Sequence, residues 1–188
     1  MTNIGVTGHR ILSANNLITL QVDDALQETW KKFTEPFFIY SSLAEGSDRL
    51  VVRRAFDRIK TSLVAPLPLK KEDYLIDFSI DSRSKFLDLL RRAEKVIELP
   101  VSPTRVAAYE SAGRYILDHV DVLIALWDGK PSRGQGGTGQ IVLEARQRGL
   151  PIAWVYAKNH RSNKNNLYVS TQINRAVSYE NFPEDKPI

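Results

Sequence analysis

The feature of this sequence that most constrains its fold is a regular alternation of short apolar segments with amphipathic stretches. The apolar segments do not alternate apolar with polar residues, as half-exposed strands do. The clearest example is Asp121–Trp127, in which every residue after Asp121 is apolar. Strands of this kind are buried on both faces, and the helices that connect them cover those faces. We therefore predict an α/β fold with a doubly wound, mainly parallel sheet of about six strands and helices on both faces, as in Rossmann-like proteins.

The element boundaries follow from hydrophobic spacing and from start and stop signals. Predicted strands cover residues 3–7, 37–41, 63–65, 96–99, 121–127 and 151–156. Predicted helices cover residues 16–33, 50–60, 71–78, 82–93, 104–119 and the stretch that ends at Gly149. Pro66 and Pro68 are expected to stop the third strand. We assign residues 1–157 to one Rossmann-like domain and 158–188 to a polar C-terminal tail or a surface-packed extension.

Composition restricts the class of protein further. The 188 residues include no cysteine, which excludes disulfides and thiolate metal sites and indicates a reducing compartment. The three histidines are widely separated, so their spacing does not indicate a metal site. The longest apolar runs are far shorter than the roughly 20 residues that span a bilayer. We therefore expect a cytoplasmic protein with no metal, no other cofactor and no membrane partner.

The net charge is a mild +4, from 26 basic and 22 acidic residues that are scattered along the chain. No stretch interleaves aromatic with basic residues, and no recognition motif is present, so nucleic acid is not an expected partner. The excess charge either serves solubility or forms a basic surface that attracts a phosphorylated small ligand.

Three polar loops follow predicted strands, at residues 7–10, 42–48 and 128–138. In a parallel sheet such loops emerge at the same edge, beyond the carboxyl ends of the strands. Two of them run into helix N-termini, where free backbone N–H groups and the helix dipole favour an anion. The sequence thus predicts a pocket for a nucleotide-derived small molecule at this edge.

Several residues of these loops have a structural interpretation beside the functional one. Gly8 either relieves a tight turn or lets a ligand approach the backbone, and His9 is a general base or a hydrogen-bonded loop residue. Arg10 is a phosphate partner or an ordinary surface arginine. Asp48 caps a helix or accepts hydrogen bonds from a ribose, and Trp127 belongs to the core or stacks on a base. The full set of predicted ligand-binding residues is Gly8, His9, Arg10, Ser42, Glu45, Gly46, Asp48, Trp127, Asp128, Arg133, Gly136, Gly137 and Thr138.

The third loop contains the pattern G-x-G-x-x-G at Gly134, Gly136 and Gly139. A dinucleotide fingerprint needs this pattern directly after a strand, in the first βα unit, with an acidic residue about 20 positions later. Here the glycines come late in the chain. Asn159 is the residue 20 positions after Gly139, and no acidic residue lies near it. The loop is instead interpreted as an anion-binding cradle or as a merely mobile connection.

The stretches GVTGHR, SSLAEGSDRL and DVLIALWDG with the later GGT together resemble the SLOG superfamily, which includes lonely-guy phosphoribohydrolases, DprA/Smf proteins and nucleotide-sensing domains. The resemblance covers roughly residues 3–156. It implies a Rossmannoid sheet that binds nucleotides or their derivatives, often in a homodimer, and it implies phosphate binding at Gly136, Gly137 and Thr138.

The catalytic members of this superfamily place P-G-G-x-G-T-x-x-E directly after the strand, with an arginine on the preceding helix. In this chain nine residues, 127–135, separate the apolar strand from Gly136. When the glycines are aligned with those of the motif across this insertion, Leu143 occupies the position of the motif glutamate. Arg114 lies on the preceding helix, but two positions away from where the family places its arginine. The resemblance therefore implies phosphate binding more directly than hydrolysis.

Three functions remain open from the sequence. The first is a sensor or carrier of a nucleotide-derived ligand. The second is a hydrolase of a nucleotide N-glycosidic bond, in which Glu45 or Glu110 replaces the motif glutamate and Arg114 assists. The third is an interaction module without a ligand.

Overall fold

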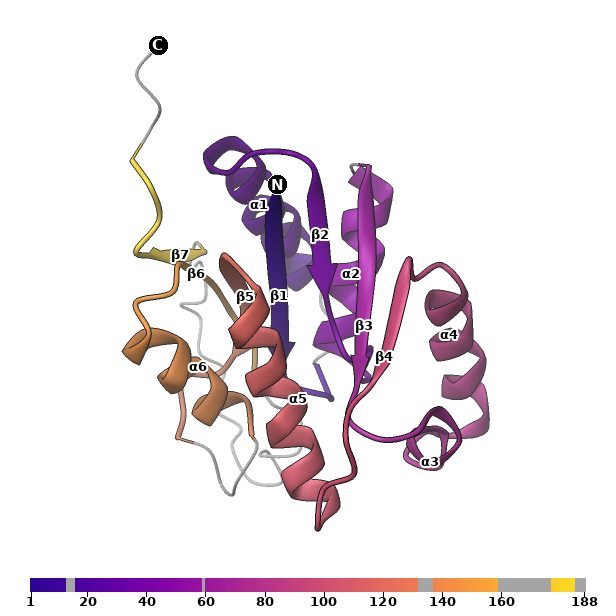
Figure 1. Cartoon of the computed structure of the whole chain (residues 1–188). Coiled ribbons are helices and arrows are strands. Elements are labelled where there is room, and N and C mark those ends of the chain that lie inside the picture. Colours follow the sequence, from indigo (N-terminus) through magenta and orange to yellow (C-terminus); the bar gives the residue numbers. More distant parts are fainter. Residues whose placement is uncertain (13–15, 59, 132–136, 159–176, 185–188) are drawn as a thin grey trace, which may run out of the picture.

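The computed structural model of this chain describes residues 1–12, 16–58, 60–131, 137–158 and 177–184. The described residues form one seven-stranded sheet in the order β4-β3-β2-β1-β5-β6-β7 (Figure 1). Strands β1 to β6 are parallel, and β7 runs antiparallel to β6. Helices α1 and α2 cover one face of the sheet, while α5 and α6 cover the other (Figure 1). The predicted doubly wound α/β fold is confirmed.

The strands are β1 (Thr2–Gly8), β2 (Phe37–Tyr40), β3 (Thr61–Leu67), β4 (Lys95–Glu98), β5 (Val122–Trp127), β6 (Ile152–Tyr156) and β7 (Ser178–Glu180). The helices are α1 (Asn16–Lys32), α2 (Ser47–Arg58), α3 (Lys71–Leu75), α4 (Ile80–Arg91), α5 (Arg105–His119) and α6 (Thr138–Gln147). No helix in the described part of the chain is long and apolar enough to cross a membrane.

The core has two layers, and β5 shows why its sequence is apolar throughout. All six residues of β5 are buried. Successive side chains of a strand point to opposite faces. Accordingly, Val122, Ile124 and Leu126 pack in the large cluster with α1 and α2. Leu123, Ala125 and Trp127 pack in a second cluster with α6.

The prediction that Pro66 stops the third strand is wrong, because β3 continues to Leu67. Proline lacks the N–H that a ladder needs, so it is tolerated only where no partner is required. The carbonyl of Val64 accepts a hydrogen bond from the backbone N–H of Ser41, so the backbone polar groups of Val64 point toward β2. Backbone groups two residues apart in a strand point the same way, and the nitrogen of Pro66 therefore also points toward the β2 side. The last β2 residue in the register is Tyr40, opposite Val64, and Pro66 therefore lies beyond the end of β2.

The seventh strand comes from the region that the sequence assigned to the tail or extension. Residues Ser178–Glu180 pair with β6. Arg146 of α6 donates to both carboxylate oxygens of Glu180, at 2.8 and 2.7 Å. The Arg146 guanidinium carbon also lies 5.5 Å from the ring of Trp127 and 5.7 Å from that of Trp154. This strand is thus linked through Arg146 to the end of β5.

The strand order reverses at β1, which lies between β2 and β5. The chain moves from β1 outward to β4 and then returns to the other side of β1 as β5. In open α/β sheets, ligands bind in the crevice outside the carboxyl ends of the strands at such a switch point. The topology therefore places the expected crevice between the loops that follow β1 and β5.

Candidate functional site

A cavity of about 360 Å³ lies at this switch point. Its volume is in the range of small-molecule sites. The ends of β1 and β5, the loop after β2, one side of α5 and the beginning of α6 line it. The predicted residues that it brings together are Gly8, His9, Arg10, Ser42, Asp48, Trp127, Asp128, Gly137 and Thr138.

Four other predicted residues of the described chain do not line the cavity. Glu45 and Gly46 are absent from the cavity wall. Glu110 and Arg114, the weak catalytic candidates on α5, face α6 instead: Glu110 accepts hydrogen bonds from Gln140 (2.7 Å) and Arg114 (2.8 Å). Arg133 and Gly136 lie outside the described residues.

The carboxyl end of β1 and the start of α2 approach each other so closely that glycine is required. A Cβ atom on Gly8 would lie 2.4 Å from Oγ of Ser47 and 2.7 Å from the carbonyl oxygen of Leu126. Ser47 donates from its backbone N–H (3.1 Å) and its hydroxyl (2.8 Å) to the carbonyl oxygen of His9. Gly8 therefore both lines the cavity and lets α2 begin directly beneath it.

His9 connects the first loop to the third. The backbone N–H of Asp128 donates to Nε2 of His9 at 3.2 Å. This contact requires the imidazole tautomer that carries its hydrogen on Nδ1. Nε2 then carries no hydrogen, so the Asp128 carboxylate oxygen that lies 3.2 Å from it receives no hydrogen bond there; both side chains are about nine-tenths buried. The hydrogen bond from the Asp128 backbone therefore holds two walls of the cavity together.

Asp48 is a buried carboxyl group in the first turn of α2. Its Oδ2 accepts from the hydroxyl of Ser41 (3.1 Å) and from the backbone N–H of Ala44 (3.3 Å). In the described part of the chain no hydrogen bond reaches Oδ1. Burial raises the pKa of Asp48 to about 6, although these two hydrogen bonds and the charges of Arg10 and Arg49 act in the opposite direction. Asp48 is therefore poised between its neutral and ionised forms near neutral pH.

Arg10 is the arginine of the cavity wall. Its guanidinium carbon lies 4.5 Å from the centre of the Tyr109 ring, a cation–π contact. The side chain is exposed, and Tyr109 is also a hydrogen-bond partner of the guanidinium. Burial lowers the pKa of Arg10, but Tyr74, Tyr109 and Asp77 outweigh it and hold the pKa above its usual value. Arg10 is thus a permanent cation on the wall of the cavity.

The N-terminus of α6 forms another wall. Gly137 is its N-cap residue, and no described side chain caps it. The first N–H groups of a helix have no partner within the helix, and the dipole favours an anion there. Gly137, Thr138 and Gly139 all border the cavity.

The sequence analysis missed the α5 wall of the cavity. Tyr109, Ala112, Gly113 and Ile116 line it at spacings of three, four and seven residues, which is one face of a helix. This spacing of one aromatic and two small residues was visible in the sequence. Tyr109 lines the cavity, whereas Glu110 and Arg114 of the same helix contact α6.

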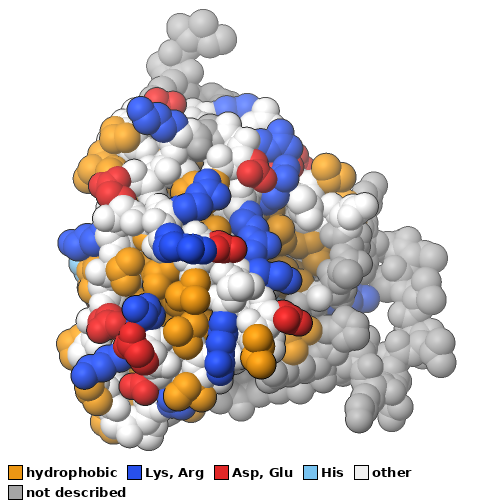
Figure 2. All heavy atoms as spheres, turned by 90° about the vertical axis from the view of Figure 1, so that its right-hand side faces the viewer, with side chains coloured by type: hydrophobic (Ala, Val, Ile, Leu, Met, Phe, Trp, Pro, Cys, Tyr) orange, Lys and Arg blue, Asp and Glu red, His pale blue; other side chains and the backbone are white. Residues whose placement is uncertain are grey.

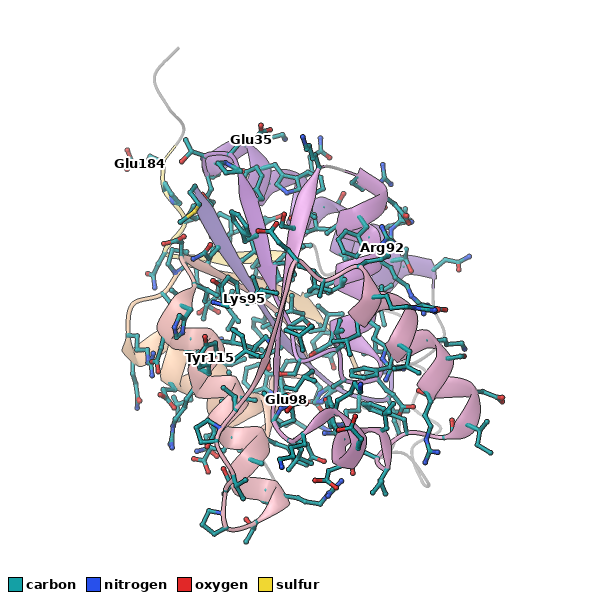
Figure 3. The ribbon with its side chains drawn as sticks, turned by 45° about the vertical axis from the view of Figure 1, so that its right-hand side comes forward. Glu35, Arg92, Lys95, Glu98, Tyr115 and Glu184 are labelled. Carbon is teal, nitrogen blue, oxygen red and sulfur yellow. The ribbon has the colours of Figure 1, made fainter. Side chains whose placement is uncertain are left out.

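A second depression lies at the β4 edge of the sheet, away from the strand ends. Its lining residues are Lys71, Leu87, Leu90, Arg91, Val96 and Glu98. Figure 2 shows this side of the molecule, where apolar side chains lie among Lys and Arg side chains and a smaller number of acidic ones. Lys95 and Glu98 lie along β4 (Figure 3). Charged side chains on an edge strand discourage pairing with another sheet. The described residues contain no group of acidic and histidine side chains that could hold a metal ion.

The fold defines a Rossmann-like α/β protein, and comparison with solved structures supports that class of fold. DNA processing protein A (DprA) from Streptococcus pneumoniae is similar, with a TM-score of 0.57 and 17% identity over 81% of this chain and 50% of that protein. DprA from Helicobacter pylori gives a TM-score of 0.54 and 15% identity, over 81% and 64% of the two chains. The structural genomics target TM1055 gives 0.50 and 14%, over 81% and 72%.

These likenesses establish a DprA-like and SLOG-like Rossmannoid fold, as the sequence resemblance implied. The chain spans about half the length of the Streptococcus protein and about two thirds of the Helicobacter protein. No family model matches the sequence. No curated protein sequence matches it either.

The expectation that nucleic acid is not a partner is wrong. Two of the structural neighbours are DprA proteins, and the Helicobacter structure was described for its single-stranded DNA binding mode. That expectation depended on the absence of a short motif in which aromatic and basic residues interleave. A fold can instead gather its basic side chains from distant segments, which no such motif reveals.

Proposed function

We propose that this chain binds a phosphorylated, nucleotide-derived small molecule in the cavity at the β1–β5 switch point, as a sensor or carrier. The observation that supports this most is the presence of Arg10, Asp48 and the N-terminus of α6, which no described side chain caps, on the walls of one cavity. These groups come from three distant parts of the chain. A permanent cation and a helix N-terminus suit a phosphate, and a carboxyl group suits sugar hydroxyls.

The ligand is oriented by these groups. Its phosphate binds the N–H groups at Gly137 and Thr138 and the guanidinium of Arg10, whose planar fork matches phosphate oxygens. Asp48 receives a ribose hydroxyl on Oδ1, the oxygen without a protein partner in the described chain. Trp127 donates its indole N–H to the carbonyl of Lys130 at 2.9 Å and forms the rigid wall beside the base.

Replacing Arg10 with alanine is expected to weaken binding of nucleoside monophosphates by at least about tenfold, because hydrogen bonds to a charged group contribute about 1.5–3 kcal/mol. Isothermal titration calorimetry with a panel of nucleoside monophosphates, ribose 5-phosphate and inorganic phosphate measures this. Arg114→Ala is the matched control, since Arg114 is an exposed arginine engaged with Glu110 and Glu144 outside the cavity. Equal affinities for the two variants would contradict the assignment of Arg10.

The same incubations distinguish a carrier from a hydrolase. The acids named as substitutes for the motif glutamate, Glu45 and Glu110, do not line the cavity. We therefore expect chromatography of the incubated nucleotides to show no free base. Release of a base from any nucleotide would overturn the sensor or carrier function in favour of N-glycosidic hydrolysis.

Single-stranded nucleic acid is a second candidate ligand, favoured by the DprA neighbours and by the Lys and Arg side chains visible in Figure 2. Binding of this kind weakens steeply with salt because counterions are released from the phosphates. Fluorescence anisotropy of a labelled oligonucleotide at two salt concentrations tests it. Competition by ribose 5-phosphate would locate the oligonucleotide in the cavity, whereas unaffected binding would locate it elsewhere on the surface.

A further inference from the structure

Arg10 is held in place by a short series of side chains that extends away from the cavity. Tyr109, whose ring faces the Arg10 guanidinium, donates a short hydrogen bond from its hydroxyl to Oδ2 of Asp77. Arg105 donates to the other oxygen of Asp77 from Nε (3.2 Å) and Nη2 (2.7 Å). Arg105 also donates to the carbonyl oxygen of Asp73, at 2.8 Å.

Asp77 lies between α3 and α4, and Tyr109 and Arg105 lie on α5, so this series joins segments about 30 residues apart in sequence. Asp77 does not line the cavity, and its side chain is only 14% exposed. A buried carboxylate that receives both a phenol and a guanidinium fixes the orientation of each. The Tyr109 ring is therefore held at one angle beneath Arg10.

We propose that Asp77 is a positioning residue for ligand binding, which acts through Tyr109 to hold the Arg10 guanidinium over the cavity. This inference rests on the proposed function, since Arg10 is the group that contacts the ligand. A flexible arginine loses side-chain entropy when it binds, and a preorganised one loses less. Asp77 and Tyr109 fix Arg10 before the ligand arrives.

The ring of Tyr109 and its hydroxyl have separable roles. Tyr109→Phe keeps the ring beneath Arg10 and removes the bond to Asp77. Asp77→Val removes the acceptor, whereas Asp77→Asn keeps an oxygen that can accept from Tyr109. Tyr115→Phe is the matched control, because Tyr115 is a tyrosine of the same helix outside the cavity wall (Figure 3).

Binding of ribose 5-phosphate, measured by calorimetry, is expected to weaken about 3- to 10-fold in both Tyr109→Phe and Asp77→Val, as for one hydrogen bond. The double variant should weaken no more than the stronger single variant, because both changes break the same connection. Asp77→Asn should recover part of the loss, and Tyr115→Phe should bind as the unchanged chain does. In an Arg10→Ala background, Asp77→Val should have no further effect.

A measurement without ligand separates this inference from the proposed function. The guanidinium carbon of Arg10 lies 4.5 Å from the centre of the Tyr109 ring, so we expect the ring to shift the Nε–H proton signal upfield in the proton NMR spectrum, with Arg10→Ala identifying the signal. Asp77→Val should reduce that shift. If the signal does not move, or if the effects of Tyr109→Phe and Asp77→Val add in the double variant, Asp77 does not position Arg10. If the unchanged chain binds neither ribose 5-phosphate nor inorganic phosphate, the proposed function fails, and the NMR result still decides whether Asp77 orients Arg10.

Discussion

Gly46→Ala is expected to lower the free energy of unfolding by about 3 kcal/mol or more. Gly46 has φ of +77°, a left-handed conformation that costs an alanine about 1–2 kcal/mol. A Cβ atom there would also lie 2.4 Å from the carbonyl oxygen of Arg10 and 2.5 Å from that of His9. Both contacts are with backbone, which cannot move without disturbing the hydrogen bonds from Ser47, and such overpacking costs about 1–3 kcal/mol.

The chain contains a matched control for this prediction. Gly149 also has a left-handed backbone, with φ of +67°, but a Cβ atom there meets nothing within 4 Å. Gly149→Ala should therefore lose only the conformational part, about 1–2 kcal/mol. Urea unfolding followed by circular dichroism measures both variants. Equal losses in the two variants would show that Gly46 matters only for its backbone angle and not for the approach of the first loop to α2.

Asp48→Asn is expected to stabilise the chain above about pH 6 and to have little effect in acid. The pKa of Asp48 rises from an ordinary 3.8 to about 6 in the folded chain, so folding favours the protonated carboxyl group. The unfolded chain releases this proton at lower pH than the folded chain does. The stability of the unchanged protein therefore falls as pH rises between about 4 and 6, and it stays lower above that range.

The size of the effect follows from the difference between the two pKa values. Each pKa unit corresponds to about 1.4 kcal/mol, so the ionised group costs the folded state about 3 kcal/mol. Asparagine keeps an oxygen for the donors of Ser41 and Ala44 and does not ionise. The advantage of Asp48→Asn should grow by about 2 kcal/mol between pH 4.5 and pH 7.5, as measured by urea unfolding at each pH.

Asp23→Asn provides a control of opposite sign. Hydrogen bonds from Arg54, and then from Arg58, lower the pKa of Asp23 despite the opposing effect of partial burial. Its contribution to stability is present above its ordinary pKa of 3.8 and is lost as the pH falls through the lower folded value. Asp23→Asn should therefore destabilise the chain at pH 7.5 and lose this effect in acid. A constant difference for Asp48→Asn across the pH range would mean that Asp48 has an ordinary pKa.

The order of strands and helices could be predicted because it depends on local patterns. The buried face of α1 contains Ile18, Val22, Ala25 and Thr29 at helical spacing. The apolar run of β5 indicates burial on both faces of the sheet. The gathering of the loops at one edge then follows from parallel topology alone, and it brought nine of the predicted residues to one cavity.

The parts that could not be predicted depend on packing between segments. Pro66 remains within β3 because β2 ends one step earlier, a matter of register that neither strand's sequence contains. Tyr109 and Glu110 are neighbours in sequence. Because α5 packs against α6, Tyr109 lines the cavity and Glu110 contacts Gln140. The contact between Asp77 and Tyr109 likewise needs α3 and α5 to be adjacent. Side-chain chemistry suggested which residues to place at the cavity, but the partners that orient them come from tertiary structure.

The attachment of β7 to α6 gives the last strand an influence on the end of β5 that borders the cavity. Arg146 is shared between the carboxylate of Glu180 and the indole rings of Trp127 and Trp154. If residues 177–188 were removed, the arginine would lose its anionic partner while still lying against Trp127. Removal of a segment far from the cavity in sequence would thereby weaken the packing of Trp127, which lines the cavity. Under the proposed function, truncated versions of this chain would differ from the intact one in ligand affinity as well as in stability.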